Sequence, residues 1–386
     1  MTTEASSANR AARPPGSARF RRATWLGVPS ERLLVAAFIW PALLVLLFVS
    51  IFPLFVALDL SFSEVELVRG GFNIHWIGLD NFRELFTGSQ KSEFLGVSRG
   101  PTPFGWLIIV AALAVLAWAL VRAARGGVPA MGLVFRALAA VFGAWLVWLV
   151  VHTLFAHGGR PGTVVVTLVF VSVGVSLQFA LGLGLAYLVT QRLPGQRFFR
   201  VVFLLPMTIT PVGVAYMFRM MTDTDKGPLE PIFGALGLGN WSWVNSAWGA
   251  RIAVIVGDTW QWTPFMFIVL LAALEGQDTE PLEAAVVDGA NRWQIFRDVT
   301  MPAIFPVALT VVLLRLIEAF KMIDLPNVLT SGGPGTATES VTLQSYIQWR
   351  SLDLGISAAT ANTLLVLVTV IAVAYVSLLR RRVAEE

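Results

Sequence analysis

The sequence predicts an all-α membrane protein, a polytopic bundle of about eight transmembrane helices. Of its 386 residues, 56% are hydrophobic and only 13% are charged, and the mean hydropathy is +0.72. A soluble domain does not tolerate so apolar a composition, whereas a helical membrane protein requires it. The chain has no cysteine, which excludes disulfides and thiolate metal sites, and its histidines form no HExxH pair, so we expect no metal centre.

Eight apolar stretches are long enough to span a bilayer, which takes roughly 20 mostly apolar residues. They lie at about 33–60, 104–121, 131–155, 163–190, 200–220, 251–274, 303–323 and 355–379. The stretch at 200–220 is the weakest, because Pro206 and Pro211 interrupt it. Residues 1–32 form a basic leader rich in Ser, Ala and Pro, which we expect to be disordered. The first span is too long for a cleaved signal peptide, so we expect it to remain.

The placement of arginine predicts how these spans are oriented. The segments expected in the cytoplasm hold Arg10, Arg13, Arg19, Arg21, Arg22, Arg32, Arg122, Arg125, Arg192, Arg197, Arg200, Arg292, Arg297 and Arg380 to Arg382. The opposite loops are poorer in arginine, except the longer loop at 61–103, and none has the strand alternation or the length of an independent core. Both termini and the loop around Glu283 are therefore predicted to be cytoplasmic, and the net charge of +4 reflects membrane topology, not nucleic-acid binding.

A polar, helix-prone segment interrupts the apolar spans between 274 and 303. It reads Glu283-Ala284-Ala285-Val286-Val287-Asp288-Gly289-Ala290, followed by Phe296, Pro302 and Pro306. Small residues leave one helix face open to close approach by another protein, and a membrane bundle does not need such a segment for its own fold. We interpret it as a short docking helix; an ordinary polar loop between helices is the alternative.

Three motifs, by their residues and by their order along the chain, resemble those of the permease subunits of binding-protein-dependent ABC importers, in the carbohydrate branch related to the maltose permease. The first is Glu283-Ala284-Ala285 with Gly289 and the end Val299-Thr300-Met301-Pro302, where Val and Met replace the usual Ile and Leu. The others are Arg200 to Leu205-Pro206, and Thr330-Ser331-Gly332-Gly333-Pro334. The first span and residues 76–82 fit the same branch.

The resemblance implies a type I ABC importer permease core of five to six helices at 159–382, with a coupling helix at 280–300. It gives coupling roles to Glu283, Ala284, Ala285, Asp288, Gly289 and Ala290, and a loop facing the solute-binding protein to Gly332, Gly333 and Pro334. The remaining parts are a first helix and outer loop at 33–91, an inserted hairpin of two spans at 92–158, and a cytoplasmic tail at 383–386.

The implied partners are a second permease subunit, two ATP-binding-cassette ATPases and an extracytoplasmic solute-binding protein, in the lipid of a bacterial or archaeal cytoplasmic (inner) membrane. The chain has no phosphate-binding loop of its own, because its only lysines, Lys91, Lys226 and Lys321, do not follow a glycine. We therefore expect a subunit that is not an enzyme and holds no cofactor, with ATP and Mg bound by the partner ATPases.

Ionisable residues at membrane depth are costly, so each is a candidate functional residue. Arg315, Glu318 and Lys321 recur at a spacing of three, which puts them along one helix face. In the family that the chain resembles, the substrate path runs along this span and the preceding one. The candidates for that path are Asp258, Trp260, Trp262, Phe265, Arg315, Glu318, Lys321 and Met322.

These residues support two interpretations. Carboxylates can accept sugar hydroxyls and tryptophan faces can stack on sugar rings; the alternative is a structural ion network with tryptophans at the membrane boundary. If Arg315 and Lys321 face a pore, they would suit an anionic sugar, but Glu318 and Asp258 could equally neutralise them. Trp243 and Trp248, like Trp241, are expected in an outer loop that can contact the binding protein.

The predicted function is translocation of a sugar, sugar derivative or polyol by alternating access, driven by the partner ATPases. An ion-coupled secondary transporter of a small polar solute is the alternative, with Asp258, Glu318 and Lys321 as proton-relay groups. That alternative leaves the Glu283 segment unexplained and shows no inverted repeat. A membrane-embedded enzyme would need a metal cluster or a nucleophile–base pair, and the sequence indicates neither.

Overall fold

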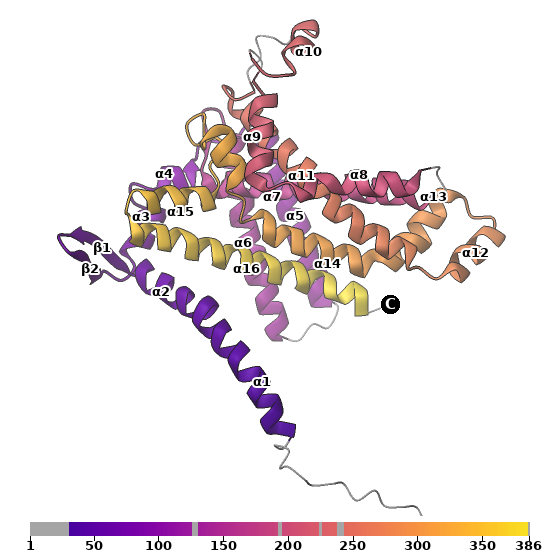
Figure 1. The fold of residues 1–386 in the computed structure, drawn as a ribbon, viewed down its shortest axis with the longest axis horizontal. Helices are drawn as coiled ribbons and strands as arrows, with labels where there is room; N and C mark the ends of the chain where they lie inside the picture. Colours follow the sequence, from indigo (N-terminus) through magenta and orange to yellow (C-terminus); the bar gives the residue numbers. More distant parts are fainter. Residues whose placement is uncertain (1–30, 126–129, 192–194, 224–225, 238–242, 385–386) are drawn as a thin grey trace, which may run out of the picture. The chain divides into compact units, whose positions relative to one another are not determined.

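The computed structural model describes residues 31–125, 130–191, 195–223, 226–237 and 243–384 (Figure 1). The chain divides into two compact units, Met1–Phe55 and Val56–Glu386. Nearly all of the predicted leader lies outside the described residues, as do Arg192, Trp241 and the last two residues of the predicted tail.

Helices dominate the chain. In order, the elements are α1 (Glu31–Leu46), the π-helical turn η1 (Leu47–Ile51), α2 (Phe52–Ser61), β1 (Ser63–Val68), β2 (Gly71–Trp76), α3 (Asp80–Phe86), α4 (Lys91–Phe94), β3 (Gly96–Val97), α5 (Pro103–Arg125), α6 (Ala130–Leu154), β4 (Arg160–Pro161), α7 (Thr163–Thr190), α8 (Gln196–Thr208), α9 (Pro211–Met221), α10 (Glu230–Ala235), α11 (Ala247–Glu275), α12 (Thr279–Val287), α13 (Arg292–Gln294), the π-helical turn η2 (Ile295–Thr300), α14 (Met301–Ala319), the π-helical turn η3 (Pro326–Thr330), α15 (Val341–Arg350) and α16 (Leu354–Ala384).

Seven continuous helical segments among the described residues are long and apolar enough to cross a membrane, and the number is eight if one bent pair counts as a span. The seven are Phe38–Ser61, Pro103–Arg125, Met131–Leu154, Thr163–Thr190, Ala247–Glu275, Arg292–Ala319 and Leu354–Ser377. Each corresponds to a predicted apolar stretch. The prediction of an all-α, polytopic membrane bundle is confirmed.

The predicted span at 200–220 is the bent pair, since α8 and α9 meet at an angle of 95°. Ile209 and Thr210 are extended at the break. Thr210 caps α9 by accepting from Gly213 N at 3.3 Å, and Pro211 occupies the first helical position, where its missing N–H costs nothing. The local sequence therefore starts a new helix where a straight span would continue.

The core of unit Val56–Glu386 forms where α7 packs along α11, with α14 and α16 beside them. Gly182 on α7 permits this close approach: a Cβ built there would lie 2.6 Å from the Cβ of Met266 on α11. Small residues at helix contacts serve this purpose in membrane bundles, where lipid supplies no hydrophobic drive for helix association. α12 and α13 lie at one end of this unit and α3, α4 and α15 at the other (Figure 1).

The outer loop at 61–103 contains strands that the sequence did not predict. β1 and β2 pair antiparallel, with Val68 opposite Gly71, around a turn in which Gly70 has φ +102°. Further on, β3 pairs with β4, so that Val97 lies opposite Arg160. The α5–α6 hairpin therefore begins and ends next to two residues, Val97 and Arg160, that lie opposite each other in this strand pair.

Candidate functional site

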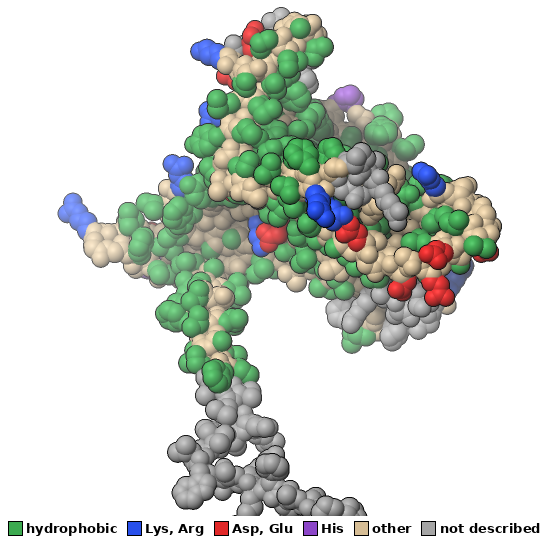
Figure 2. All heavy atoms as spheres, turned by 45° about the vertical axis from the view of Figure 1, so that its right-hand side comes forward, with side chains coloured by type: hydrophobic (Ala, Val, Ile, Leu, Met, Phe, Trp, Pro, Cys, Tyr) green, Lys and Arg blue, Asp and Glu red, His purple; other side chains and the backbone are tan. Residues whose placement is uncertain are grey.

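The segment predicted to couple to an ATPase consists of α12, which lies between two candidate spans, and of α13 and η2, which form the first turns of the candidate span Arg292–Ala319. Glu283, Ala284 and Asp288 are exposed, and so are the apolar Val287 (86%) and Trp293 (67%). Acidic side chains gather at the right-hand end of the face in Figure 2, the end that holds α12 in Figure 1. Exposed apolar side chains beside charged ones, here between two candidate spans and in the first turn of the second, are features of a protein interaction surface.

Gly289 ends α12 in a Schellman motif. Its φ is +79°, its N–H donates to Val286 O at 3.1 Å, and the Ala290 N–H donates to Ala285 O at 3.0 Å. This left-handed conformation favours glycine, which explains the residue at that position. One residue later a capping box starts α13, with Asn291 and Gln294 exchanging hydrogen bonds of 2.8 and 2.9 Å. The turn between the two helices is therefore tight and is held by hydrogen bonds at both of its ends.

The base of this segment is tied to three membrane helices. Gln277 Nε2 donates to Thr300 O at 3.0 Å, which closes the loop from the end of α11 to the start of α14. Arg200 on α8 forms an ion pair with Glu275, the last residue of α11. Through these contacts, a displacement of α12 can be transmitted directly to α8, α11 and α14.

A buried polar network joins α7, α11 and α14 through Gln178, Asp258 and Arg315, which are exposed by 0%, 3% and 2%. Arg315 Nη2 donates to the two Asp258 carboxylate oxygens at 2.7 and 2.6 Å, and Arg315 Nε donates to Gln178 Oε1 at 2.8 Å. Gln178 Nε2 donates back to Asp258 Oδ2 at 2.8 Å. Because both charged groups are hydrogen-bonded, the Asp258–Arg315 ion pair can remain charged although it is buried away from water.

Trp262 completes this network, since the Arg315 Cζ lies 4.9 Å from the centre of its ring, a cation–π contact. Phe265 packs edge-on against Trp262 with ring centres 6.5 Å apart. Glu318 and Lys321, which the sequence placed on one helix face with Arg315, form an exposed ion pair of 2.8 Å with each other and not with Arg315. Arg315 and Lys321 thus each face a carboxylate, and neither is a free cation.

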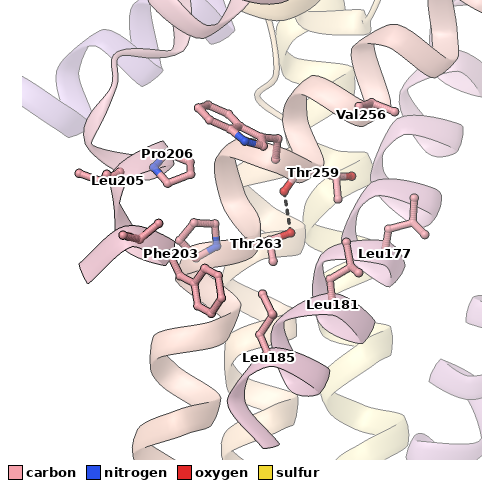
Figure 3. Close-up of a pocket in the computed structure, with 12 residues that line it drawn as sticks. Leu177, Leu181, Leu185, Phe203, Leu205, Pro206, Val256, Thr259 and Thr263 are labelled. Carbon is pink, nitrogen blue, oxygen red and sulfur yellow. Dashed lines mark hydrogen bonds between the residues drawn. The ribbon is translucent and has the colours of Figure 1, made fainter. Parts of the chain in front are cut away.

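A cavity of about 720 Å³ lies between α7, α8 and α11. Figure 3 shows Leu177, Leu181 and Leu185 on one side of it and Phe203, Leu205 and Pro206 on another. Of the predicted path residues, Trp260 lines this cavity, beside Thr259 and Thr263. Met322 is partly buried and packs against the cluster around Val254 and Leu325.

The loop predicted to face a binding protein is held by its own hydrogen bonds. Gly332 has φ +83° and its N–H donates to Pro326 O at 3.1 Å, the Gly333–Pro334 bond is cis, and Thr338 Oγ1 donates to Gly333 O at 3.1 Å. Beside it, burial and the neighbouring Glu93 carboxylate raise the pKa of Glu339 to about 8.

Sequence reasoning did not select Gln178 as a member of the site. Its signal was present as a lone amide in the apolar stretch at 163–190, but an isolated polar residue does not reveal its partners on other helices. Trp248 was expected in a loop and instead lies in the first turn of α11, under the guanidinium of Arg251.

The profile of the family described as "Binding-protein-dependent transport system inner membrane component" matches residues 178–384, which include the coupling segment and the network of Gln178, Asp258 and Arg315. The chain belongs to this family. It is a multi-pass membrane protein of the ABC importer permease class, and this membership favours the ATP-driven interpretation over the ion-coupled one.

Two of the relatives belong to sugar transport systems. The trehalose/maltose transport system permease protein MalF of Thermococcus litoralis is 34% identical over 217 residues, which is 56% of this chain and 74% of the relative. The sulfoquinovosyl glycerol transport system permease protein SmoG of Agrobacterium fabrum is 30% identical over 223 residues, 57% of this chain and 70% of the relative.

A solved structure shares the fold over most of the chain. It is described as a bacterial ABC transporter involved in the import of the acidic polysaccharide alginate, with a TM-score of 0.59 and 18% identity over 90% of this chain and 96% of that one. The match extends well beyond residues 178–384.

Proposed function

We propose that this chain is a permease subunit of an ATP-driven, binding-protein-dependent importer that translocates a sugar, a sugar derivative or a polyol by alternating access. Family membership supports the importer class, and the names of the relatives from Thermococcus litoralis and Agrobacterium fabrum support the sugar class. The observation that supports the proposal most directly is the exposed, rigidly terminated α12.

In the proposed mechanism, α12 lodges in a groove of an ATPase through Glu283 and the small residues Ala284 and Ala285. ATP-driven closure of two ATPases moves α12, and the contacts Arg200–Glu275 and Gln277–Thr300 pass this motion to the bundle. A rigid-body displacement of this type needs a segment that does not bend, and the Schellman motif at Gly289 followed by a capping box supplies one. The spans then change between two arrangements that expose the path on opposite sides.

The remaining partners follow from exposed surfaces. A second permease subunit is proposed to cover the apolar cavity between α7, α8 and α11, which places Trp260, Thr259 and Thr263 next to the path. An extracytoplasmic solute-binding protein is proposed to contact the loop of Gly332, Gly333 and Pro334. ATP and Mg are assigned to the partner ATPases, and this chain is proposed to hold no cofactor.

The proposed location is a bacterial or archaeal cytoplasmic membrane, with both termini and α12 in the cytoplasm. The arginine distribution supports this orientation. A tag after Arg382 that reacts with an impermeant reagent in intact cells would contradict it.

The test is the ATPase activity of the complex purified after co-expression with its genomic neighbours, in the presence of the binding protein and a panel of neutral and acidic sugars. Stimulation by one sugar is expected and identifies the substrate class. If no ATPase co-purifies, the role of α12 is refuted. If uptake fails on loss of the proton gradient but survives ATP depletion, the transporter is ion-coupled.

A further inference from the structure

A second cavity, of about 480 Å³, lies at the end of α11 that is opposite the coupling segment. Its walls come from three parts of the chain: the end of α6 with Gly159 and Arg160, the first turns of α11 with Trp248 and Arg251, and the loop at 334–337. None of its lining residues is acidic. The inserted α5–α6 hairpin therefore helps to build a site together with the permease core.

Arg251 lines this cavity and only 4% of its surface is exposed, yet none of the carboxylates in the described part of the chain forms an ion pair with it. Its Nε donates to Ala337 O at 2.7 Å, and its Cζ lies 5.2 Å from the centre of the Trp248 ring. Among the described residues, its two terminal nitrogens donate to no acceptor and it forms no ion pair. A buried guanidinium with unused donors needs an acceptor, because leaving a charge unpaired away from bulk water is costly.

Two other cations in the predicted spans, Arg315 and Lys321, differ from Arg251 because each is paired with a carboxylate. Arg315 is bonded to both carboxylate oxygens of Asp258, and Lys321 is paired with Glu318. A second cation, Arg160, lines the same cavity as Arg251, and its backbone is held by the pairing of β3 with β4. The positive end of the 29-residue helix α11 adds to the potential there.

We propose that this cavity binds a small acidic sugar, with the carboxylate held by Arg251 and Arg160. The planar fork of a guanidinium matches the two oxygens of a carboxylate. Trp248 is 52% exposed and offers a flat face to a sugar ring, and the Thr336 hydroxyl makes no hydrogen bond among the described residues, so it is available to a sugar hydroxyl. The volume lies within the ~300–1,000 Å³ of typical small-molecule sites.

This site rests on the proposed function as a sugar importer, and it refines that function by naming the class of sugar. It is distinct from the cavity lined by Trp260, which is apolar and lies between α7, α8 and α11. The acidic-sugar site is held by cations at the far end of α11 and lies on the side proposed to receive solute.

The experiment is a calorimetric titration of the purified full-length chain, in nanodiscs of phosphatidylcholine, with glucuronate and with glucose. Glucuronate is expected to bind saturably, and glucose at least ~10-fold more weakly, since it lacks the carboxylate. Arg251→Gln should weaken glucuronate binding ~10- to 100-fold. The matched control is Arg350→Gln, because Arg350 also lies over an aromatic ring, 5.8 Å from that of Tyr346, but lines none of these cavities. It should bind glucuronate as the unaltered chain does.

Because Arg251 is buried, its replacement can also unfold the chain, so a second variant leaves it in place. Thr336→Glu puts a carboxylate into the cavity, and it should weaken glucuronate binding by competing for the same cations. The proposal is overturned if glucose and glucuronate bind equally, or if a folded variant with either change binds glucuronate normally. It is also overturned if phosphatidylglycerol in the nanodisc abolishes glucuronate binding, because the cavity is then a lipid headgroup site. The titration uses no nucleotide or partner, so its failure leaves the ATPase test of the importer function standing.

Discussion

The charge of Arg315 lies inside the membrane bundle and is balanced by one carboxylate, Asp258. Burying such an ion pair costs free energy, and removing one of its two members costs more, because the remaining buried charge has no partner. Asp258→Asn is therefore expected to lower the free energy of unfolding by about 3–5 kcal/mol. Thermal unfolding of the purified chain in detergent measures the change.

The matched control for this prediction is Lys321→Gln, which breaks a pair that is largely exposed. Exposed pairs contribute about 0–1 kcal/mol, so this variant should unfold close to the unaltered chain. Equal, small losses in the two variants would mean that Asp258 is not a structural anchor, and its predicted place in the substrate path would regain support. The geometry favours the structural role, because the hydrogen bonds to Arg315 and Gln178 already engage both Asp258 oxygens.

Glu339 predicts a pH dependence of stability. Burial, then the nearby Glu93 carboxylate, raise the pKa of Glu339 from 4.5 to about 8, so the folded chain holds this proton more tightly than the unfolded chain does. The stabilisation is complete below pH ~4.5 and is lost as the pH rises through about 8. The free energy of unfolding should therefore fall by an amount on the order of 1–3 kcal/mol between pH 6 and pH 9. The unfolding temperature should fall with it.

Glu339→Gln is the variant that tests this explanation, because glutamine mimics the protonated acid at every pH. Its unfolding temperature should depend less on pH over the same range and should exceed that of the unaltered chain at pH 9. An unchanged pH dependence would assign the effect to another group.

At the scale of elements, the turn after α12 determines whether the coupling segment is rigid. Gly289→Pro removes the N–H that bonds Val286 O and imposes a φ near −65° where the chain needs +79°. Insertion and assembly should persist, because the turn lies outside the spans, but uptake per ATP hydrolysed should fall at least ~10-fold as the link to the ATPase slackens. Uptake and ATPase activity measured together in proteoliposomes give this ratio.

Gly289→Asn is the control for the same turn. Asparagine tolerates the left-handed conformation and keeps the N–H, and a Cβ at this position meets no atom within 4 Å. Coupling in this variant should stay near that of the unaltered chain. Normal uptake by Gly289→Pro would refute the docking role of α12.

The sequence predicted elements well where the signal is local. The apolar stretches located the spans, and the Glu283 to Ala290 motif located an exposed helix that ends at a left-handed glycine. The sequence did not predict contacts between residues that are distant from each other in the chain. The spacing of Arg315, Glu318 and Lys321 suggested one ion network, yet α14 turns Arg315 inward to Asp258, 57 residues away. Pairing between Val97 and Arg160 is likewise invisible to a periodicity argument.

At the scale of the whole molecule, the α5–α6 hairpin, which the sequence predicts to be an insertion, has ends that meet. Val97 and Arg160 lie opposite each other in the β3–β4 pair, so the chain can be closed there without moving the elements on either side. An insertion of two spans together would preserve the orientation of every later span. The hairpin also packs on the core, since Leu149 is buried in the main apolar cluster.

Replacement of residues 98–159 by Asn-Gly should therefore give a chain that still inserts and still couples to its ATPases. The two-residue linker suits a hairpin turn between directly paired residues, and lipid can cover the face that the hairpin leaves, because lipid tails are as apolar as the lost side chains. The unfolding temperature should fall through lost packing, and glucuronate binding should weaken, because Thr153, Leu154 and Gly159 of the cavity wall are removed although Arg160 is kept. Deletion of α5 alone is the control: an odd number of spans is removed, so a tag after Arg382 should change sides and transport should cease. If the Asn-Gly chain fails to insert while that control inserts, the hairpin is part of the folding core and not an addition to it.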